Sequence, residues 1–188
     1  MRSSLRTKLA TVAAALLATA FTGAVTASGA QAAAPDEPPT GWKMVVHQMA
    51  SGYLFPDAYT DIDDEVQVWN GDLVPDQGYK WLITRDSEHP GAYRIRTNPH
   101  KKCLTIGSST SDYVKMRDCT GSTSQSWYIR HVPGTTSDWA IVPYSYDDHA
   151  IRPGITTSPT DYVYPRQMWG GQPDLTHAWR FVEPPRGR

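Results

Sequence analysis

The stretch Lys102–Arg130, KCLTIGSSTSDYVKMRDCTGSTSQSWYIR, holds the features on which the interpretation of the chain depends. It contains both cysteines of the sequence, Cys103 and Cys119, and one Gln-x-Trp motif at 125–127. Apolar and polar residues alternate in three short segments that Ser, Thr, Gly and Asp runs separate. Such a period of two, bounded by turn residues, is typical of half-buried β-strands. The stretch therefore predicts a unit of short strands.

Related patterns precede and follow this stretch. Each of three units opens with an aromatic-x-aliphatic triplet, continues with an apolar pair and a third strand, and closes on a tryptophan before an apolar position. The opening aromatics are 51 and 46 residues apart, and the closing tryptophans are 46 and 52 apart. Self-similarity at a nearly constant period predicts repeated, pseudo-symmetric modules. The triplets begin at Trp42, Tyr93 and Trp139, and the closing residues are Trp81, Trp127 and Trp179.

Four short strands in each of three units predict an all-β fold of about twelve strands. Propellers have a similar period but normally need at least four blades. Three units can instead close around a three-fold axis into a small barrel capped by hairpins. We therefore predict a β-trefoil over 41–183, with repeats at about 41–90, 91–137 and 138–183.

The first 32 residues have the composition of a secretory signal peptide. Three basic residues precede an Ala-rich apolar segment, and Ala30-Gln31-Ala32 matches a cleavage site. We expect cleavage after Ala32 and a secreted product; a membrane anchor is the alternative. Outside the repeats we expect a Pro-rich spacer at 33–40 and a short tail at 184–188.

The charge of the remaining chain argues against two classes of partner. Residues 1–32 carry three basic and no acidic side chains, so 15 Lys and Arg and 19 Asp and Glu remain, a formal charge of −4. Nucleic acids and anionic membranes attract clustered positive charge. Neither is expected as the main partner, and no later apolar run is long enough to span a bilayer.

The two cysteines lie 16 positions apart. In an exported protein this favours a local disulfide between Cys103 and Cys119, worth about 3 kcal/mol on the chain-entropy model. Free thiols or a pair of metal ligands are the alternatives, although neither a CxxC motif nor paired histidines accompany them. No cofactor is expected.

The pattern Cys103-Leu104, Val114, Asp118-Cys119 and Gln125-Ser126-Trp127 resembles the repeat of the ricin B-type (QxW) lectin family. The outer units are similar to the same repeat in degenerate form. The resemblance implies a structural role for the motif, with Trp81, Trp127 and Trp179 filling the core of a small barrel. Only Gln125 keeps the glutamine, and the matching positions hold Tyr79 and His177. His177 is then expected to be a hydrogen-bonded structural histidine.

In that family, the resemblance implies, each sugar site combines an Asp after the second strand, an aromatic at the end of the third strand and a nearby amide. An aromatic face suits the C–H face of a pyranose, and its hydroxyls need fixed polar partners. The family Asp is replaced in all three units, by Pro56, Thr105 and Arg152, and Arg117 replaces the aromatic in the second. The second unit is therefore expected to be the weakest site.

The expected site residues lie in the first and third units. Whether the two aromatics are exposed platforms or buried core residues is left open by their place on a third strand. A substitute carboxylate one place late would need a bulge to face the sugar. The candidates are Asp57, Trp69 and Asn70 in the first unit, and Trp169 with Gln167 or Arg166 in the third.

Other chemistry finds little support. The acidic run 61–65 lacks the glycine and distal glutamate of a calcium-binding EF-hand loop. The six histidines lack the spacing of metal ligands, and no nucleophile elbow, HExxH or SxxK motif occurs. We therefore expect no catalytic residues, no metal site and no enzyme activity.

The sequence favours a secreted, non-catalytic carbohydrate-binding protein. The alternative is a protein-interaction trefoil with decayed sugar sites, such as an accessory or delivery subunit of a toxin or an inhibitor-like binder, because the family Asp is missing and aromatic residues are typical of interfaces. A small hydrolase is a third possibility. The expected partners are a carbohydrate or glycoconjugate and, in the alternative, another protein.

Overall fold

Twelve short strands form the framework of the residues that this computed structural model describes. The chain divides into two compact parts, residues 1–31 and 32–188. The structure describes residues 37–56, 65–70, 80–97, 102–154 and 160–185, all in the second part. The strands are β1 (Gly41–His47), β2 (Gly52–Pro56), β3 (Val66–Asn70), β4 (Trp81–Arg85), β5 (Tyr93–Thr97), β6 (Lys102–Thr105), β7 (Lys115–Asp118), β8 (Trp127–His131), β9 (Asp138–Pro143), β10 (His149–Pro153), β11 (Thr160–Gln167) and β12 (Trp179–Val182). Three one-turn 3₁₀ helices are η2 (Thr123–Gln125), η3 (Trp169–Gly171) and η4 (Leu175–His177).

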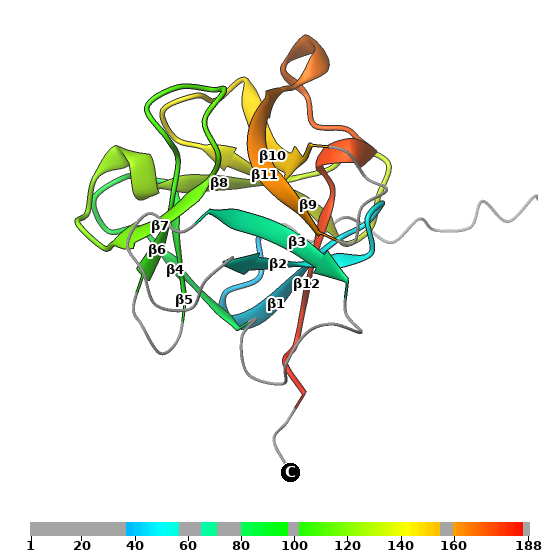
Figure 1. Cartoon of the computed structure of the whole chain (residues 1–188), viewed down its shortest axis with the longest axis horizontal. Helices are drawn as coiled ribbons and strands as arrows, with labels where there is room; N and C mark the ends of the chain where they lie inside the picture. Colours follow the sequence, from blue (N-terminus) through cyan, green and yellow to red (C-terminus); the bar gives the residue numbers. More distant parts are fainter. Residues whose placement is uncertain (1–36, 57–64, 71–79, 98–101, 155–159, 186–188) are drawn as a thin grey trace, which may run out of the picture. The chain divides into compact units, whose positions relative to one another are not determined.

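Six of the strands close into a barrel. Antiparallel pairing runs from β1 to β4, β5, β8, β9 and β12 and returns to β1. The other six form the hairpins β2–β3, β6–β7 and β10–β11, which surround a common centre in Figure 1. A six-stranded barrel with three hairpins is a β-trefoil, so the predicted fold class is confirmed.

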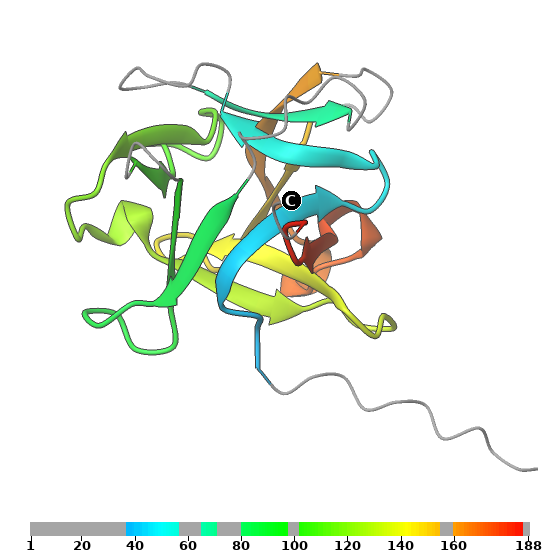
Figure 2. The same cartoon turned by 90° about the horizontal axis from the view of Figure 1, so that it is seen from below.

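The three hairpins meet through equivalent valines. The Val66 amide donates to the carbonyl of Val114 (2.8 Å), and the Val114 amide donates to the carbonyl of Val163 (2.9 Å). All three side chains are fully buried. Figure 2 shows the β2–β3 hairpin beside β1, at the side of the barrel where the hairpins gather. The hairpins thus form one continuous cap whose outer surface crosses the borders between units.

One tryptophan from each unit fills the barrel. Trp81, Trp127 and Trp179 are fully buried, and the indole Nε1–H of each donates to a main-chain carbonyl at 2.9–3.0 Å. The acceptors are Leu54, Leu104 and Ile151, the equivalent residues of the three second strands. A buried indole must satisfy its N–H, and this repeated bond does so. The predicted core role of the three tryptophans is confirmed.

Pairing also shows where the sequence alignment of the first unit was wrong by one residue. Val45 faces Phe181 just as Ile141 faces Ile129, so Val45 occupies the aliphatic core position that had been assigned to Met44. Val45 is fully buried, whereas Trp42 is 38% exposed. A shift of one residue moves a strand's side chains to the other face, which explains the exposure of Trp42.

None of the helices in the described ranges is long and apolar enough to cross a membrane.

Candidate functional site

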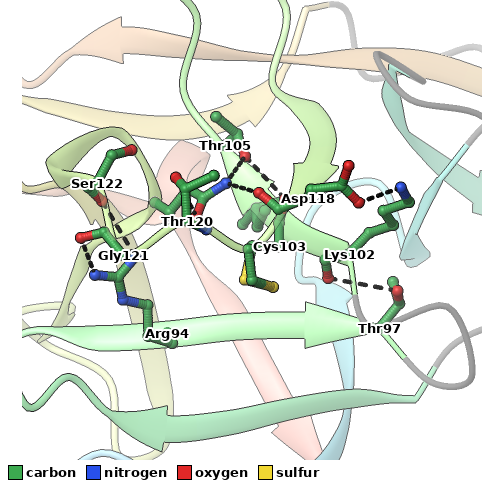
Figure 3. The surroundings of a disulfide bond; sticks show 12 residues. Arg94, Thr97, Lys102, Cys103, Thr105, Asp118, Thr120, Gly121 and Ser122 are labelled. Carbon is green, nitrogen blue, oxygen red and sulfur yellow. Dashed lines mark hydrogen bonds and ion pairs between the residues drawn. A yellow bond between two sulfur atoms is a disulfide. The ribbon is translucent and has the colours of Figure 1, made fainter.

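The disulfide closes the hairpin of the second unit. Cys103 and Cys119 are bonded, with their Cα atoms 5.1 Å apart, which confirms the predicted pairing. Figure 3 shows the bond between the start of β6 and the end of β7, beside the ion pair of Lys102 with Asp118. The cross-link fixes the open end of the β6–β7 hairpin, and the loop between β6 and β7 lies at the other end.

Gln125, the last residue of η2, anchors that hairpin from the other side. Its Oε1 accepts from the Thr120 amide (2.9 Å), and its Nε2 donates to the Asp118 carbonyl (2.7 Å) and the Thr105 hydroxyl (3.2 Å). The side chain is buried, so these bonds meet the polar requirement of a buried amide. The glutamine side chain therefore links the end of β6 to the end of β7 and the residues after it.

A cavity of about 570 Å³ opens on the outer face of this second unit. Its walls come from the end of β6, the β6–β7 loop, the outer face of β7 and η2, and they combine hydroxyls, one carboxylate, two cations and one aromatic ring. The lining residues are Thr105, Ile106, Gly107, Ser108, Ser111, Asp112, Tyr113, Lys115, Arg117 and Ser124. We call it the Tyr113 pocket. Sequence reasoning had ranked this unit as the weakest site.

Asp112 supplies a fixed carboxylate to the pocket. Its Oδ2 accepts from the Ser109 amide (3.0 Å) and the Ser108 hydroxyl (3.1 Å), and these bonds, the Ser109 amide first, hold the pKa of the carboxyl below its ordinary value. An ionised carboxylate held by such bonds keeps a fixed orientation, and its remaining lone pairs can accept from a ligand hydroxyl.

Gly107 makes room for that carboxylate. A Cβ at residue 107 would lie 2.3 Å from the Cβ of Asp112, closer than real side chains approach. At the next residue, the Tyr146 hydroxyl donates to the Ser108 carbonyl (3.1 Å). The start of the loop that carries Asp112 therefore requires a glycine and is bonded to the third unit.

Sequence reasoning missed Asp112 and Tyr113. The signal lay in the segment GSSTSDY at 107–113, where serines and a glycine surround a carboxylate and an aromatic. Ser and Asp side chains bond readily to nearby backbone amides. The sequence could indicate such a local turn but not that it borders a cavity.

The first-unit candidates are only partly placed. Asp57 lies outside the described residues, and Asn70 ends β3 opposite Gly52. Trp69 is half-buried; its Nε1–H donates to Oε1 of Gln67 (2.8 Å), and its ring lies 5.1 Å from that of Phe55. Because Asp57 is outside the described residues, the first-unit site stays a prediction.

The third-unit candidates lie at the end of β11 and beyond. Arg166 faces Ala150 just as Trp69 faces Tyr53, so Arg166, and not Trp169, is the equivalent of Trp69. Trp169 lies three residues later, in η3, and is 92% exposed. Gln167 is exposed and pairs with His149 across the hairpin. Trp169 is thus an exposed aromatic on a short helix beyond the third strand.

His177 is buried at the end of η4, in the place of Gln125. Its Nδ1 lies 3.0 Å from Oδ1 of Asp174, and burial lowers its pKa. A second buried imidazole, His47, accepts from the Ala50 amide at Nδ1 (3.1 Å) and bonds the Thr176 carbonyl through Nε2 (3.0 Å). One nitrogen accepts and the other donates, so His47 is held in the neutral form. The burial of His177 and its contact with Asp174 agree with the structural role expected for this histidine.

A serine, a histidine and an aspartate also meet in the structure. The Ser126 hydroxyl donates to Oδ2 of Asp86 (2.7 Å), and His89 Nδ1 lies 3.1 Å from Ser126 and 3.0 Å from Asp86. In a catalytic triad the serine and the carboxylate bond opposite ring nitrogens, whereas here both contact Nδ1. Ser126 is also fully buried. The arrangement suits a structural link between the β4–β5 turn and the start of β8.

No group of three His, Cys, Asp or Glu side chains suited to a metal ion occurs among the residues that the structure describes. Most of the acidic run 61–65 lies outside them.

No protein-family model matches this chain, and no curated protein matches it in sequence. Solved structures do match. The designed three-fold symmetric protein ThreeFoil aligns with a TM-score of 0.63 and 19% identity, over 76% of this chain and 99% of that one. The Haemophilus ducreyi cytolethal distending toxin gives 0.63 and 13%, over 81% and 89%.

A third match is a Polyporus squamosus lectin bound to the epitope Neu5Aca2-6Galb1-4GlcNAc, with a TM-score of 0.60 and 15% identity, over 77% of this chain and 49% of that one. At these identities the likeness concerns the fold alone. The chain is a β-trefoil similar in architecture to lectins and to toxin subunits.

Proposed function

We propose that this protein is a secreted, non-catalytic, carbohydrate-binding β-trefoil and that its principal site is the Tyr113 pocket. The observation that carries the proposal is the combination, in one cavity, of an aromatic wall, a fixed carboxylate and several hydroxyls. The resemblance of the repeat to the ricin B-type family and the architecture shared with lectins support it.

The pocket has the two kinds of group that a pyranose needs. Tyr113 offers a flat apolar surface to the C–H face of a sugar ring. Asp112 offers a carboxylate whose orientation Ser108 and Ser109 fix. Thr105, at the end of β6, occupies the position of the family carboxylate. In this proposal Asp112, in the β6–β7 loop, supplies the carboxylate in its place. The sites proposed from sequence around Trp69 and Trp169 remain secondary candidates.

The test is a glycan array on the protein from residue 33 onward, followed by titration calorimetry with the best ligand. We expect Asp112→Asn and Tyr113→Ala each to weaken binding about ten-fold or more, since a fixed polar contact and a stacked ring are each worth roughly 1–2 kcal/mol. Asp147→Asn, which changes an exposed carboxylate that does not line the pocket, is the matched control. Failure of the unmodified protein to bind any glycan would remove the proposal.

A second candidate function is a protein-interaction subunit, such as the accessory or delivery part of a toxin. The specific observation in its favour is the exposure of large apolar side chains at Trp169 (92%), Leu175 (57%) and Met49 (54%). Exposed aromatics are typical of protein interfaces. Binding of a purified effector enzyme that Trp169→Ala abolishes, without any glycan binding, would favour this candidate over the first.

Secretion is proposed from residues 1–32 alone. N-terminal sequencing of the protein in the medium of a secreting host is expected to begin at Ala33. A product that keeps residues 1–32 and sediments with membranes would contradict it.

A further inference from the structure

Tyr113, the aromatic wall of the pocket, is the first member of a longer row of planar side chains. Its ring centre lies 4.6 Å from that of Tyr162 and 4.7 Å from that of Tyr164. The guanidinium carbon of Arg166 lies 4.4 Å from the centre of the Tyr164 ring. We call these four side chains the tyrosine row.

The row lies on the outer surface of the hairpin cap. Tyr162, Tyr164 and Arg166 alternate along β11 with buried Val163 and Pro165, so all three occupy the face directed away from the core. Four residues of strand cover about 13 Å. The row therefore continues from the rim of the pocket across the third unit for more than the length of one sugar ring.

The row is held rigidly against the pocket. The amide of Val114, next to Tyr113, donates to the carbonyl of Val163, next to Tyr162 and Tyr164 (2.9 Å). Burial, and then a hydrogen bond with Tyr113, raises the pKa of Tyr164 to about 12. The Tyr164 phenol therefore stays neutral at physiological pH and adds no negative charge to the row.

We propose that the Tyr113 pocket is one end of a longer groove, and that the protein binds an extended oligosaccharide whose further rings lie on the tyrosine row. This inference rests on the proposed function. Its motivation is chemical: flat aromatic faces and a stacked guanidinium suit the C–H faces of successive pyranoses, and phenol hydroxyls can bond their substituents. Two units would then contribute to one binding surface.

The experiment compares each sugar with a longer ligand that contains it. Calorimetry would use galactose with lactose, N-acetylglucosamine with chitotetraose, and glucose with cellotetraose. We expect the unmodified protein to bind the longer member of its preferred pair more tightly. Tyr162→Ala and Arg166→Ala should each weaken the longer ligand about five- to ten-fold, the value of one stacking contact, and leave the monosaccharide unchanged.

Arg130→Ala is the matched control, because Arg130 also lies over a tyrosine, Tyr128 at 5.2 Å, on the barrel strand β8, and neither residue lines the pocket. Arg166→Ala changes a half-buried surface residue, so it tests the row even if Tyr162→Ala fails to fold. Equal affinity for both members of a pair, or equal losses for both ligands, would overturn this inference and leave the proposed function intact. No binding of any pair would overturn both.

Discussion

Each buried indole does two jobs in this fold: it fills the barrel, and it satisfies a main-chain carbonyl. Trp127 donates to Leu104 at 3.0 Å and is fully buried. The same bond recurs in the other two units. The recurrence explains why the tryptophan persists in every unit even where the preceding glutamine has been replaced.

Trp127→Phe should therefore cost more than its change in size implies. The phenyl ring leaves the Leu104 carbonyl without its donor and opens a small cavity, and together these effects should lower the free energy of unfolding by about 2–4 kcal/mol. Urea denaturation checks this. Trp169→Phe, on a side chain that is 92% exposed, should change stability by less than about 0.5 kcal/mol; similar losses for both variants would contradict the assignment.

The lowered pKa of Asp86 predicts that the folded protein loses stability in acid. Burial opposes its ionisation, but hydrogen bonds from Ser126, Glu88 and His89 and the charge of Arg94 outweigh burial and lower its pKa to about 2. The unfolded carboxyl titrates near 3.8, so the stabilisation is complete above that pH and is lost as the pH falls toward 2. It amounts to about 2 kcal/mol.

Thermal unfolding between pH 5 and pH 2 checks this expectation against Asp86→Asn. The variant should start less stable and lose less stability across that range than the unmodified protein. Parallel losses in the two proteins would assign the acid sensitivity to other groups.

At the scale of elements, His47 joins β1 to η4. Its Nε2 bonds the Thr176 carbonyl, and its Nδ1 accepts from the Ala50 amide, an arrangement that only the neutral ring allows. Burial is the largest cause of the lowered pKa of His47, and the positive charge of Arg152 lowers it further. Arg152 stands where the second unit has Thr105, so this corner of the third unit differs electrostatically from its equivalents.

Lowering the pH should reduce the local stability of β1 and η4 before that of the equivalent elements. Above pH 6.5 His47 is neutral in both the folded and the unfolded chain, so it has no effect on pH dependence. Below that value the unfolded chain takes up a proton that the folded chain resists, and stability falls. Hydrogen exchange measured at pH 7 and at pH 5 checks this. Between the two pH values, the opening of β1 and η4 should become more favourable by a larger amount than the opening of β6 and β7.

The comparison variants are His47→Gln and His149→Gln. The first should remove part of the acid sensitivity, and the second, which changes a histidine at the start of β10, should leave it unchanged. Exchange that accelerates equally in all three units at pH 5 would contradict a local origin.

At the scale of the whole molecule, the repeat was readable and the site was not. The three tryptophans and the cysteine pair are large or reactive residues at a regular spacing, so the sequence predicted the trefoil, its core and the disulfide. Met44 was misaligned because Met44, Val45 and Val46 are all apolar, so the sequence does not show which of them faces the core. Trp169 was misaligned because the triplets at 67–69 and 167–169 have the same Gln-apolar-Trp pattern. The cavity beside Asp112 depends on how the β6–β7 loop, β7 and η2 pack together, and the tyrosine row depends on contacts between the second and third units; no local pattern records either.

Amide chemical-shift mapping of the labelled protein with its best array ligand tests the central claim most directly. The account predicts that shifts concentrate at Ser108, Ser109, Asp112 and Tyr113 of the Tyr113 pocket and extend to β11 with a longer ligand. Shifts confined to β3 or η3, or no shifts with any glycan, would contradict it.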